Sequence, residues 1–217
     1  MKFRFFSPSL RLPATARFSL LLFLLFLLLL RPAIALPGEE DQSFRGDCDA
    51  IVFTTVLQPD GKIVIGGFFQ NVNGVARQYL ARMDSGGVLD AEFQPQVNNH
   101  VYCILIQSDR KIVIGGSFSQ VNGEARSRIA RLNPDGTLDT GFNPNANNTV
   151  QCFALEADGS ILAGGLFTTM GGVTRNRIAR VSPAGTMDAV FNPNANGLVA
   201  SVAVQSDGRI LLGGGRE

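Results

Sequence analysis

The sequence predicts an all-β repeat protein, and three observations predict it. A segment pattern returns at a constant step of 49 residues, each copy carries several turn-forming dipeptides, and the stretches between turns are rich in Val, Ile, Phe and Gly. Strands and tight turns use these residue types, whereas long surface helices do not. The first 35 residues follow a different pattern.

The N-terminal segment has the order of a secretory signal peptide. Basic residues come first, an unbroken apolar run covers residues 18–30, and Ala33-Ile34-Ala35 places small residues where signal peptidase reads them. A membrane-spanning helix needs roughly 20 apolar residues, so a permanent anchor is the weaker alternative. We expect a signal helix within residues 1–35, cleavage after Ala35, and a mature protein that is secreted or on the cell surface, extracellular or periplasmic. It meets the membrane only through the signal segment before cleavage.

Removal of the leader changes the charge of the chain. The leader holds five of the 19 basic residues and none of the 18 acidic ones, so the mature chain has a net charge of −4. A mildly acidic chain without a basic cluster attracts phosphate backbones weakly. We expect no nucleic-acid partner; the expected partner is an extracellular protein or glycan.

The repeat fills most of residues 36–217, which we assign to one domain. The string Lys62-Ile63-Val64-Ile65-Gly66-Gly67 returns with Gly115-Gly116, then with Gly164-Gly165, and once more at residues 209–214. The expected units cover about residues 52–100, 101–149, 150–198 and, in part, 199–217.

Each unit is expected to form four antiparallel strands. In the second copy these are residues 101–107, 111–118, 127–132 and 137–142, separated by turns rich in Asn, Asp, Gly and Pro. Four such strands match a blade of a β-propeller, with the most apolar strand wedged innermost between neighbouring blades. A parallel β-helix is the competing architecture, but its coils carry fewer hairpin turns.

Positions that are identical in every unit are expected to serve the fold. The glycine pairs end the second strand, where missing side chains allow neighbouring backbone to approach. An arginine also returns in each whole unit, and we expect it to be partly buried and paired with an aspartate across a hairpin. These residues are Arg82, Arg131 and Arg180, with Asp90, Asp139 and Asp188. A ligand site is expected at positions that differ between units.

No catalytic, cofactor or metal site is predicted. His100 is the single histidine, which excludes a multi-histidine metal centre, and we expect it to be a solvated loop residue. Cys103 and Cys152 occupy the same place in two units and are expected to be small buried residues. Two functions stay open: a non-catalytic binding or scaffold module with an unknown ligand, and an exported hydrolase or lyase that acts on carbohydrate or peptide through carboxylates on blade loops.

The repeat resembles that of a known family. The motif from Gln58 to Gly67, followed by Val72-Asn73-Gly74, and the run from Arg128 to Asp139 are similar to the delta-60 repeat of bacterial secreted proteins. The similarity covers nearly all of the mature chain. The resemblance implies a β-propeller and export, and it supplies no active site because the biochemical function of that family is unknown.

The register of the two ends predicts an incomplete ring. Residues 41–44 lie one step before residues 90–93, so the mature chain is expected to start with the outer strand of a preceding blade, about residues 39–45. The partial unit at the C-terminus would supply only two inner strands. We therefore expect a truncated copy of a longer ring, with unpaired strands that favour association.

Overall fold

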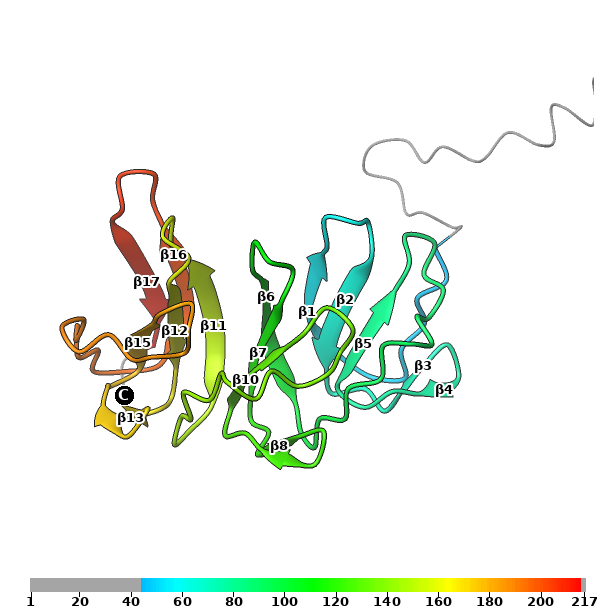
Figure 1. Ribbon diagram of the computed structural model, residues 1–217, viewed down its shortest axis with the longest axis horizontal. Coiled ribbons are helices and arrows are strands. Elements are labelled where there is room, and N and C mark those ends of the chain that lie inside the picture. Colours follow the sequence, from blue (N-terminus) through cyan, green and yellow to red (C-terminus); the bar gives the residue numbers. More distant parts are fainter. Residues whose placement is uncertain (1–43, 216–217) are drawn as a thin grey trace, which may run out of the picture. The chain divides into compact units, whose positions relative to one another are not determined.

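Each whole repeat folds into a three-stranded antiparallel sheet and a separate two-stranded hairpin (Figure 1). The computed structural model describes residues 44–215, and β-strands are the only regular elements in that range. Within it, no helix is long and apolar enough to cross a membrane. The expected leader at residues 1–35, with its signal helix, lies outside the described residues. Of the outer strand expected at residues 39–45, only Phe44 and Arg45 are described, and neither is in a strand.

The sheets are built from strands at equivalent places in the repeats. The first strands are β1 (Val52–Leu57), β6 (Val101–Ile106), β11 (Val150–Leu155) and β16 (Val199–Val204). The second strands are β2 (Ile63–Gly67), β7 (Ile112–Gly116), β12 (Ile161–Gly165) and β17 (Ile210–Gly214). The third strands are β5 (Leu80–Met83), β10 (Ile129–Leu132) and β15 (Ile178–Val181). The second strand is central in each three-stranded sheet, and β16 and β17 form a two-stranded sheet.

The Asn-Gly turn of the first two units, and the Gly171-Gly172 turn of the third, make hairpins of their own, which the sequence pattern did not predict. The hairpin strands are β3 (Asn71–Val72) with β4 (Val75–Ala76), β8 (Gln120–Val121) with β9 (Glu124–Ala125), and β13 (Thr169–Met170) with β14 (Val173–Thr174). Asn122 and Gly123 both have positive φ, 51° and 81°, as a type I′ turn requires. This turn matches the twist of two flanking strands, so even two-residue strands pair across it.

The expected fourth strand is reduced to a single bridge, so a four-stranded blade is not confirmed. Leu138 pairs with Leu132, and the same bridge joins Leu89 to Met83 and Met187 to Val181. The chain then turns away because the Asp139 carboxylate accepts a hydrogen bond from the backbone N–H of Gly141, at 3.1 Å. An aspartate that binds its own following backbone favours a turn over a strand.

The hydrophobic core lies between successive sheets. Strand β1 packs beside β6, β6 beside β11, and β11 beside β16. Val64 and Leu80 of the first unit share a buried cluster with Ile112 and Ile114 of the second. Each sheet is therefore stabilised by its neighbour, as expected of a repeat protein in which one unit cannot bury its own apolar face.

Burial follows the sequence prediction in the middle units and departs from it at the ends. Val101, Ile104, Ile112 and Ile114 are buried, and Ile106 is half-buried. The equivalents of Ile106 and Ile114, Leu57 in β1 and Leu212 in β17, are 68% and 43% exposed. Among the described residues, the first and last sheets each pack against one neighbouring sheet, so the other face of each is open there.

Candidate functional site

The two glycines of each pair admit different neighbours. A Cβ on Gly66 would lie 2.7 Å from the Val101 side chain of the next unit, and a Cβ on Gly67 would lie 2.2 Å from the Ile51 carbonyl oxygen. The pairs Gly115-Gly116 and Gly164-Gly165 repeat this arrangement. The missing side chain of the second glycine thus lets neighbouring backbone approach, as the sequence predicts. That of the first glycine makes room for side chains of its own sheet and of the next sheet.

The recurring arginine and aspartate lie together in every whole unit. The Nε atoms of Arg82 and Arg131 lie 2.9 and 2.8 Å from carboxylate oxygens of Asp90 and Asp139, and Arg180 Nη1 lies 3.3 Å from Asp188. Burial alone would raise the pKa of Asp90, but hydrogen bonds from Lys62 and Arg82 outweigh it and lower that pKa to about 2. These carboxylates are held ionised by their cations.

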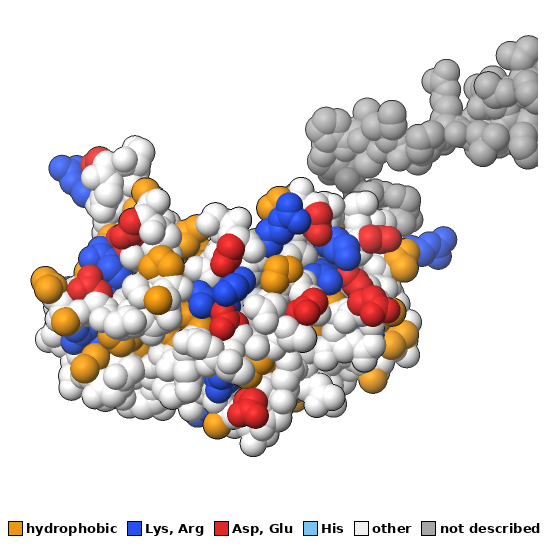
Figure 2. Space-filling model, in the orientation of Figure 1, with side chains coloured by type: hydrophobic (Ala, Val, Ile, Leu, Met, Phe, Trp, Pro, Cys, Tyr) orange, Lys and Arg blue, Asp and Glu red, His pale blue; other side chains and the backbone are white. Residues whose placement is uncertain are grey.

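The same arginines also join one unit to the next. Arg82 Nη1 donates to the carbonyl oxygen of Pro134 at 2.5 Å, and Arg131 Nη1 donates to that of Pro183, each in the following unit. Arg180 instead donates to both carboxylate oxygens of Glu156, at 2.6 and 2.8 Å. On the face in Figure 2, basic and acidic side chains lie intermingled, without a wide patch of one sign. The repeated charged residues are thus engaged in contacts within and between units.

Five aromatic rings gather where the first two units meet, and we call them the aromatic surface. They are Phe53, Phe68, Tyr79, His100 and Tyr102, drawn from β1, β6 and the ends of the adjoining strands. The ring centroids of Phe68 and His100 lie 4.5 Å apart, and those of Phe53 and Tyr102 lie 5.0 Å apart. His100 Nδ1 lies 3.1 Å from the Tyr102 hydroxyl. Phe53 and Phe68 are 42% and 46% exposed, so part of each side chain is open to solvent.

The aromatic surface occupies positions that change from unit to unit. One step of 49 residues along the chain, the place of Phe68 is taken by Ser117, that of Tyr79 by Arg128, and that of His100 by Thr149. The backbone beneath is nevertheless the same: φ is 64° at Tyr79 and 67° at Arg128. The backbone at these positions is therefore alike in successive units, and the first unit places Phe68, Tyr79 and His100 on it.

His100 differs from its sequence prediction as a solvated loop residue. It does precede β6, but its ring is half-buried among the four other rings of the aromatic surface. The prediction was wrong because the neighbours of His100 come from segments as far back as Phe53. Alignment of the three units at the 49-residue step would have shown that Phe68, Tyr79 and His100 all stand at positions that vary between units.

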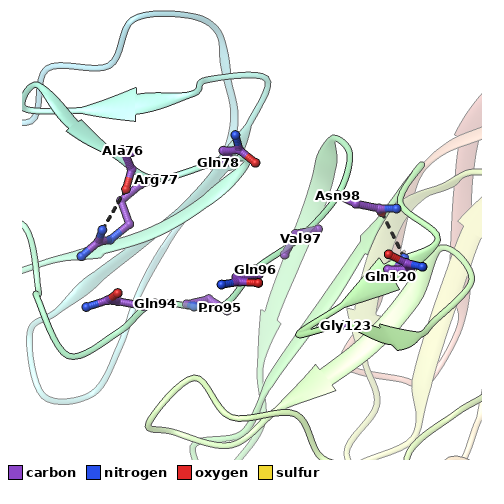
Figure 3. Close-up of a pocket in the computed structure, with 10 residues that line it drawn as sticks. All are labelled: Ala76, Arg77, Gln78, Gln94, Pro95, Gln96, Val97, Asn98, Gln120 and Gly123. Atoms are coloured by element: carbon purple, nitrogen blue, oxygen red, sulfur yellow. Dashed lines mark hydrogen bonds between the residues drawn. The ribbon is translucent and has the colours of Figure 1, made fainter.

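A groove with amide side chains on its walls lies between the segments 76–78 and 94–98 (Figure 3). It has a volume of about 410 Å³, within the roughly 300–1,000 Å³ typical of small-molecule sites. Figure 3 shows the segment 76–78 facing the segment 94–97, with Asn98, Gln120 and Gly123 at the other end. Its lining residues are Ala76, Arg77, Gln78, Gln94, Pro95, Gln96, Val97, Asn98, Gln120 and Gly123.

One substitution between units changes the contacts across this groove, and the equivalent hollow of the third unit, lined by Asn176, Arg177, Asn194, Ala195 and Asn196, is smaller, about 310 Å³. In the second and third units the position of Gln96 is Asn145 or Asn194, each with positive φ, and both asparagines bond across to the opposite segment. Asn145 accepts from the Ser127 backbone N–H at 3.2 Å. Asparagine tolerates this left-handed conformation, whereas glutamine does not favour it. Gln96 lacks positive φ and its backbone pairs with Asn122, so no such bond crosses the first groove.

The cysteines lie at contacts between units. Cys103 Sγ lies 3.9 Å from the Val150 carbonyl oxygen and Cys152 Sγ lies 3.6 Å from that of Val199, in each case in the following unit. Cys103 is buried as expected, and Cys152 is half-buried. Burial raises the pKa of the Cys152 thiol to about 11. Both are free thiols held in the neutral form.

A second hollow lies between β15 and the C-terminal hairpin. Its walls include Glu156, Arg180 and Asp188. The backbone N–H groups of Val190 and Phe191 bind the Asp188 carboxylate and lower its pKa, so this group is not a proton donor near neutral pH. Among residues 44–215, no group of three His, Cys, Asp or Glu side chains could hold a metal ion.

Sheets that recur every 49 residues and pack through their first strands define an all-β repeat protein. The family described as "Domain of unknown function (DUF5122) beta-propeller" matches this chain three times in tandem, at residues 58–93, 107–142 and 156–191. The chain therefore carries β-propeller repeats of unknown function. No curated protein matches it.

Proposed function

We propose that this chain is a secreted, non-catalytic binding module that recognises a glycan at the aromatic surface. The observation that carries the proposal is the exposure of Phe53 and Phe68 at positions where the other units have different residues. Side chains that the fold needs recur in every unit, whereas these rings do not. The leader ending at Ala35 and the resemblance to the delta-60 repeat support export of the protein.

The chemistry of the aromatic surface suits a sugar ligand. An aromatic face packs against the C–H face of a sugar ring, and burial of apolar area in such a contact is favourable. The Tyr102 hydroxyl and the His100 imidazole supply polar atoms at the same place, where sugar hydroxyl groups could donate and accept. Aromatic side chains lose little conformational entropy on binding, since they rotate about two bonds.

The surface also carries its own spectroscopic probes. The chain has no tryptophan and two tyrosines, Tyr79 and Tyr102, and both belong to the aromatic surface. Its single histidine, His100, belongs there as well. Tyrosine fluorescence and the His100 ring resonances in NMR spectra therefore report on this surface alone.

A glycan array followed by tyrosine-fluorescence titration tests the proposal. We expect a glycan that changes the fluorescence, and we expect Phe68→Ala and Phe53→Ala each to weaken its binding by about tenfold, as loss of roughly 1–2 kcal/mol of apolar contact would do. Leu57→Ala is the control, because Leu57 is more exposed than either ring and lies outside the surface. If the control weakens binding as much as Phe68→Ala does, the aromatic surface is not the site.

The same array separates this proposal from the alternative of an exported hydrolase or lyase. A binding module leaves the bound glycan intact on long incubation. Cleavage of the glycan that is abolished by Glu156→Gln would instead identify Glu156, in the second hollow, as a catalytic carboxylate and would overturn the non-catalytic proposal.

A further inference from the structure

We propose that the amide-lined groove binds a uronate residue of an acidic polysaccharide, with Arg77 contacting the carboxylate. This inference rests on the proposed function for its ligand class, a glycan, and adds a second contact site and a charge preference. The groove borders the aromatic surface along the chain on both sides, since Gln78 precedes Tyr79 and Asn98 lies two residues before His100.

Arg77 differs from its equivalents in the atoms that it leaves free. Arg126 Nη2 donates to the Thr140 carbonyl oxygen at 3.3 Å, and Arg175 Nη2 donates to two carbonyl oxygens, at 2.8 and 3.0 Å. Arg77 bonds only through Nη1, to the carbonyl oxygen of Ala76, among the described residues. The Nε atoms of Arg77, Arg126 and Arg175 are all buried without a hydrogen-bond partner among the described residues. The Arg77 guanidinium thus keeps an additional donor group, Nη2, at the groove.

Gln94 explains why Nη2 of Arg77 is free. The carbonyl oxygen equivalent to that of Thr140 belongs to Ala91, and the Gln94 side chain donates to it at 2.5 Å. The other units have Asn143 or Asn192 at this position, one methylene shorter. Glutamine in the first unit takes the oxygen that the arginine uses elsewhere, and the guanidinium is left for a ligand.

The remaining lining fits a hydroxylated ligand with one negative charge. The side-chain amides of Gln78, Gln96 and Gln120 make no hydrogen bond to a described residue, and each amide can both donate and accept. Vicinal hydroxyl groups of a sugar need this combination. Arg77 is the only charged residue of the lining, so the groove favours a carboxylate over a neutral group. A peptide ligand would also need apolar recesses for its side chains, and Pro95 and Val97 are the only sizeable apolar lining residues.

Isothermal titration of the purified protein with galacturonate oligomers tests the inference. The matched ligand is the methyl ester of the same oligomers, which keeps the sugar hydroxyls and removes the charge. We expect the wild type to bind the acid more tightly than the ester, by about tenfold or more, because a hydrogen bond to a charged group contributes about 1.5–3 kcal/mol. Equal affinity for acid and ester overturns the inference and leaves the aromatic surface unaffected.

Matched variants separate a binding role of Arg77 from a structural one. Arg77→Gln is expected to abolish the preference for acid over ester with little change in the melting temperature. Arg126→Gln is expected to lower the melting temperature and retain the preference, since Arg126 is buried and its Nη2 is bonded to protein. The reverse pattern would contradict the assignment.

A second pair of variants gives the first groove the asparagines of the other units. Gln94→Asn should return the Ala91 carbonyl oxygen to Arg77, and Gln96→Asn should allow the backbone to adopt positive φ and bond across the groove. We expect both to weaken galacturonate binding at least tenfold while the protein stays folded. Wild-type affinity in both variants would overturn the groove as the site.

Equal binding of poly-glutamate would overturn the assignment of the ligand as a sugar. If the proposed function holds, Phe68→Ala weakens the binding of the acid and of the ester by the same factor. The aromatic surface and the groove are therefore tested by different results.

Discussion

Replacement of Gly116 by alanine tests how closely the backbone packs at the end of the second strand. A Cβ at Gly116 would lie 2.0 Å from the His100 carbonyl oxygen and 3.1 Å from Phe118 Cδ1. Because non-bonded atoms need about 3 Å or more, the His100 backbone would have to move by roughly 1 Å. That movement also strains the hydrogen bond, 3.0 Å long, from the Ser117 N–H to the same oxygen.

The expected loss of stability follows from these two effects. Overpacking costs about 1–3 kcal/mol and a weakened hydrogen bond about 0.5–1.5 kcal/mol, so Gly116→Ala should destabilise the protein by about 2–4 kcal/mol. In urea unfolding followed by circular dichroism, with a slope of about 1–3 kcal/mol per molar urea, the midpoint should fall by about 1–2 M.

Gly213→Ala is the matched control for this prediction. Gly213 is the first glycine of the last pair, and the nearest atom to its Cβ would be Ser201 Cβ at 3.6 Å, an ordinary contact. We expect a change within about 0.5 kcal/mol. Equal midpoints for the two variants would refute the close-approach explanation.

Three further predictions concern charge and processing. Arg131→Met should destabilise the protein by about 3 kcal/mol in urea unfolding, because it breaks a largely buried ion pair and the tie to Pro183, although Lys111 still pairs with Asp139. The Arg180 side chain is more exposed, so Arg180→Met, which breaks the pairs with Asp188 and Glu156, should cost less, about 1–2 kcal/mol. Equal costs would contradict this ranking. Asp90 has a pKa of about 2 when folded and about 3.9 when unfolded. Its contribution to stability, on the order of 2 kcal/mol, is therefore complete above about pH 5 and is lost as the pH falls toward 2. Asp90→Asn should flatten the profile of stability against pH in that range, and an unchanged profile would count against the ion pair. N-terminal sequencing of the exported protein should begin at Leu36, whereas a full-length product extracted from membranes would show that residues 18–30 are an anchor.

The recurrence of residues predicts the structural positions well, because each unit must solve the same packing problem. The pairing of Arg131 with Asp139 and the burial of Ile112 and Ile114 follow from local pattern and are present in the structure. The bond from Arg131 to Pro183 could not be predicted, since it depends on how one sheet stacks on the next. The fourth strand was overestimated because the turn at Asp139 competes with strand pairing.

The candidate site was harder to predict because it depends on side chains that meet across units. Phe53 and Tyr102 occupy the same place in successive repeats, yet their contacts with each other and with His100 arise from the stacking of β1 on β6. The groove depends on a smaller difference, glutamine for asparagine at residues 94 and 96. Such a difference is chemically conservative, and its effect on the backbone becomes clear only beside Asn145 and Asn194.

Tyrosine fluorescence during glycan titration tests most directly the claim that the variable positions of the first two units form the recognition surface. Both tyrosines lie on this surface, and tryptophan is absent from the chain. We expect a saturable change with a bound glycan that is retained in Arg126→Gln and weakened about tenfold in Phe68→Ala. A glycan that binds by calorimetry without altering the tyrosine signal, and with equal affinity for Phe68→Ala, would contradict the claim.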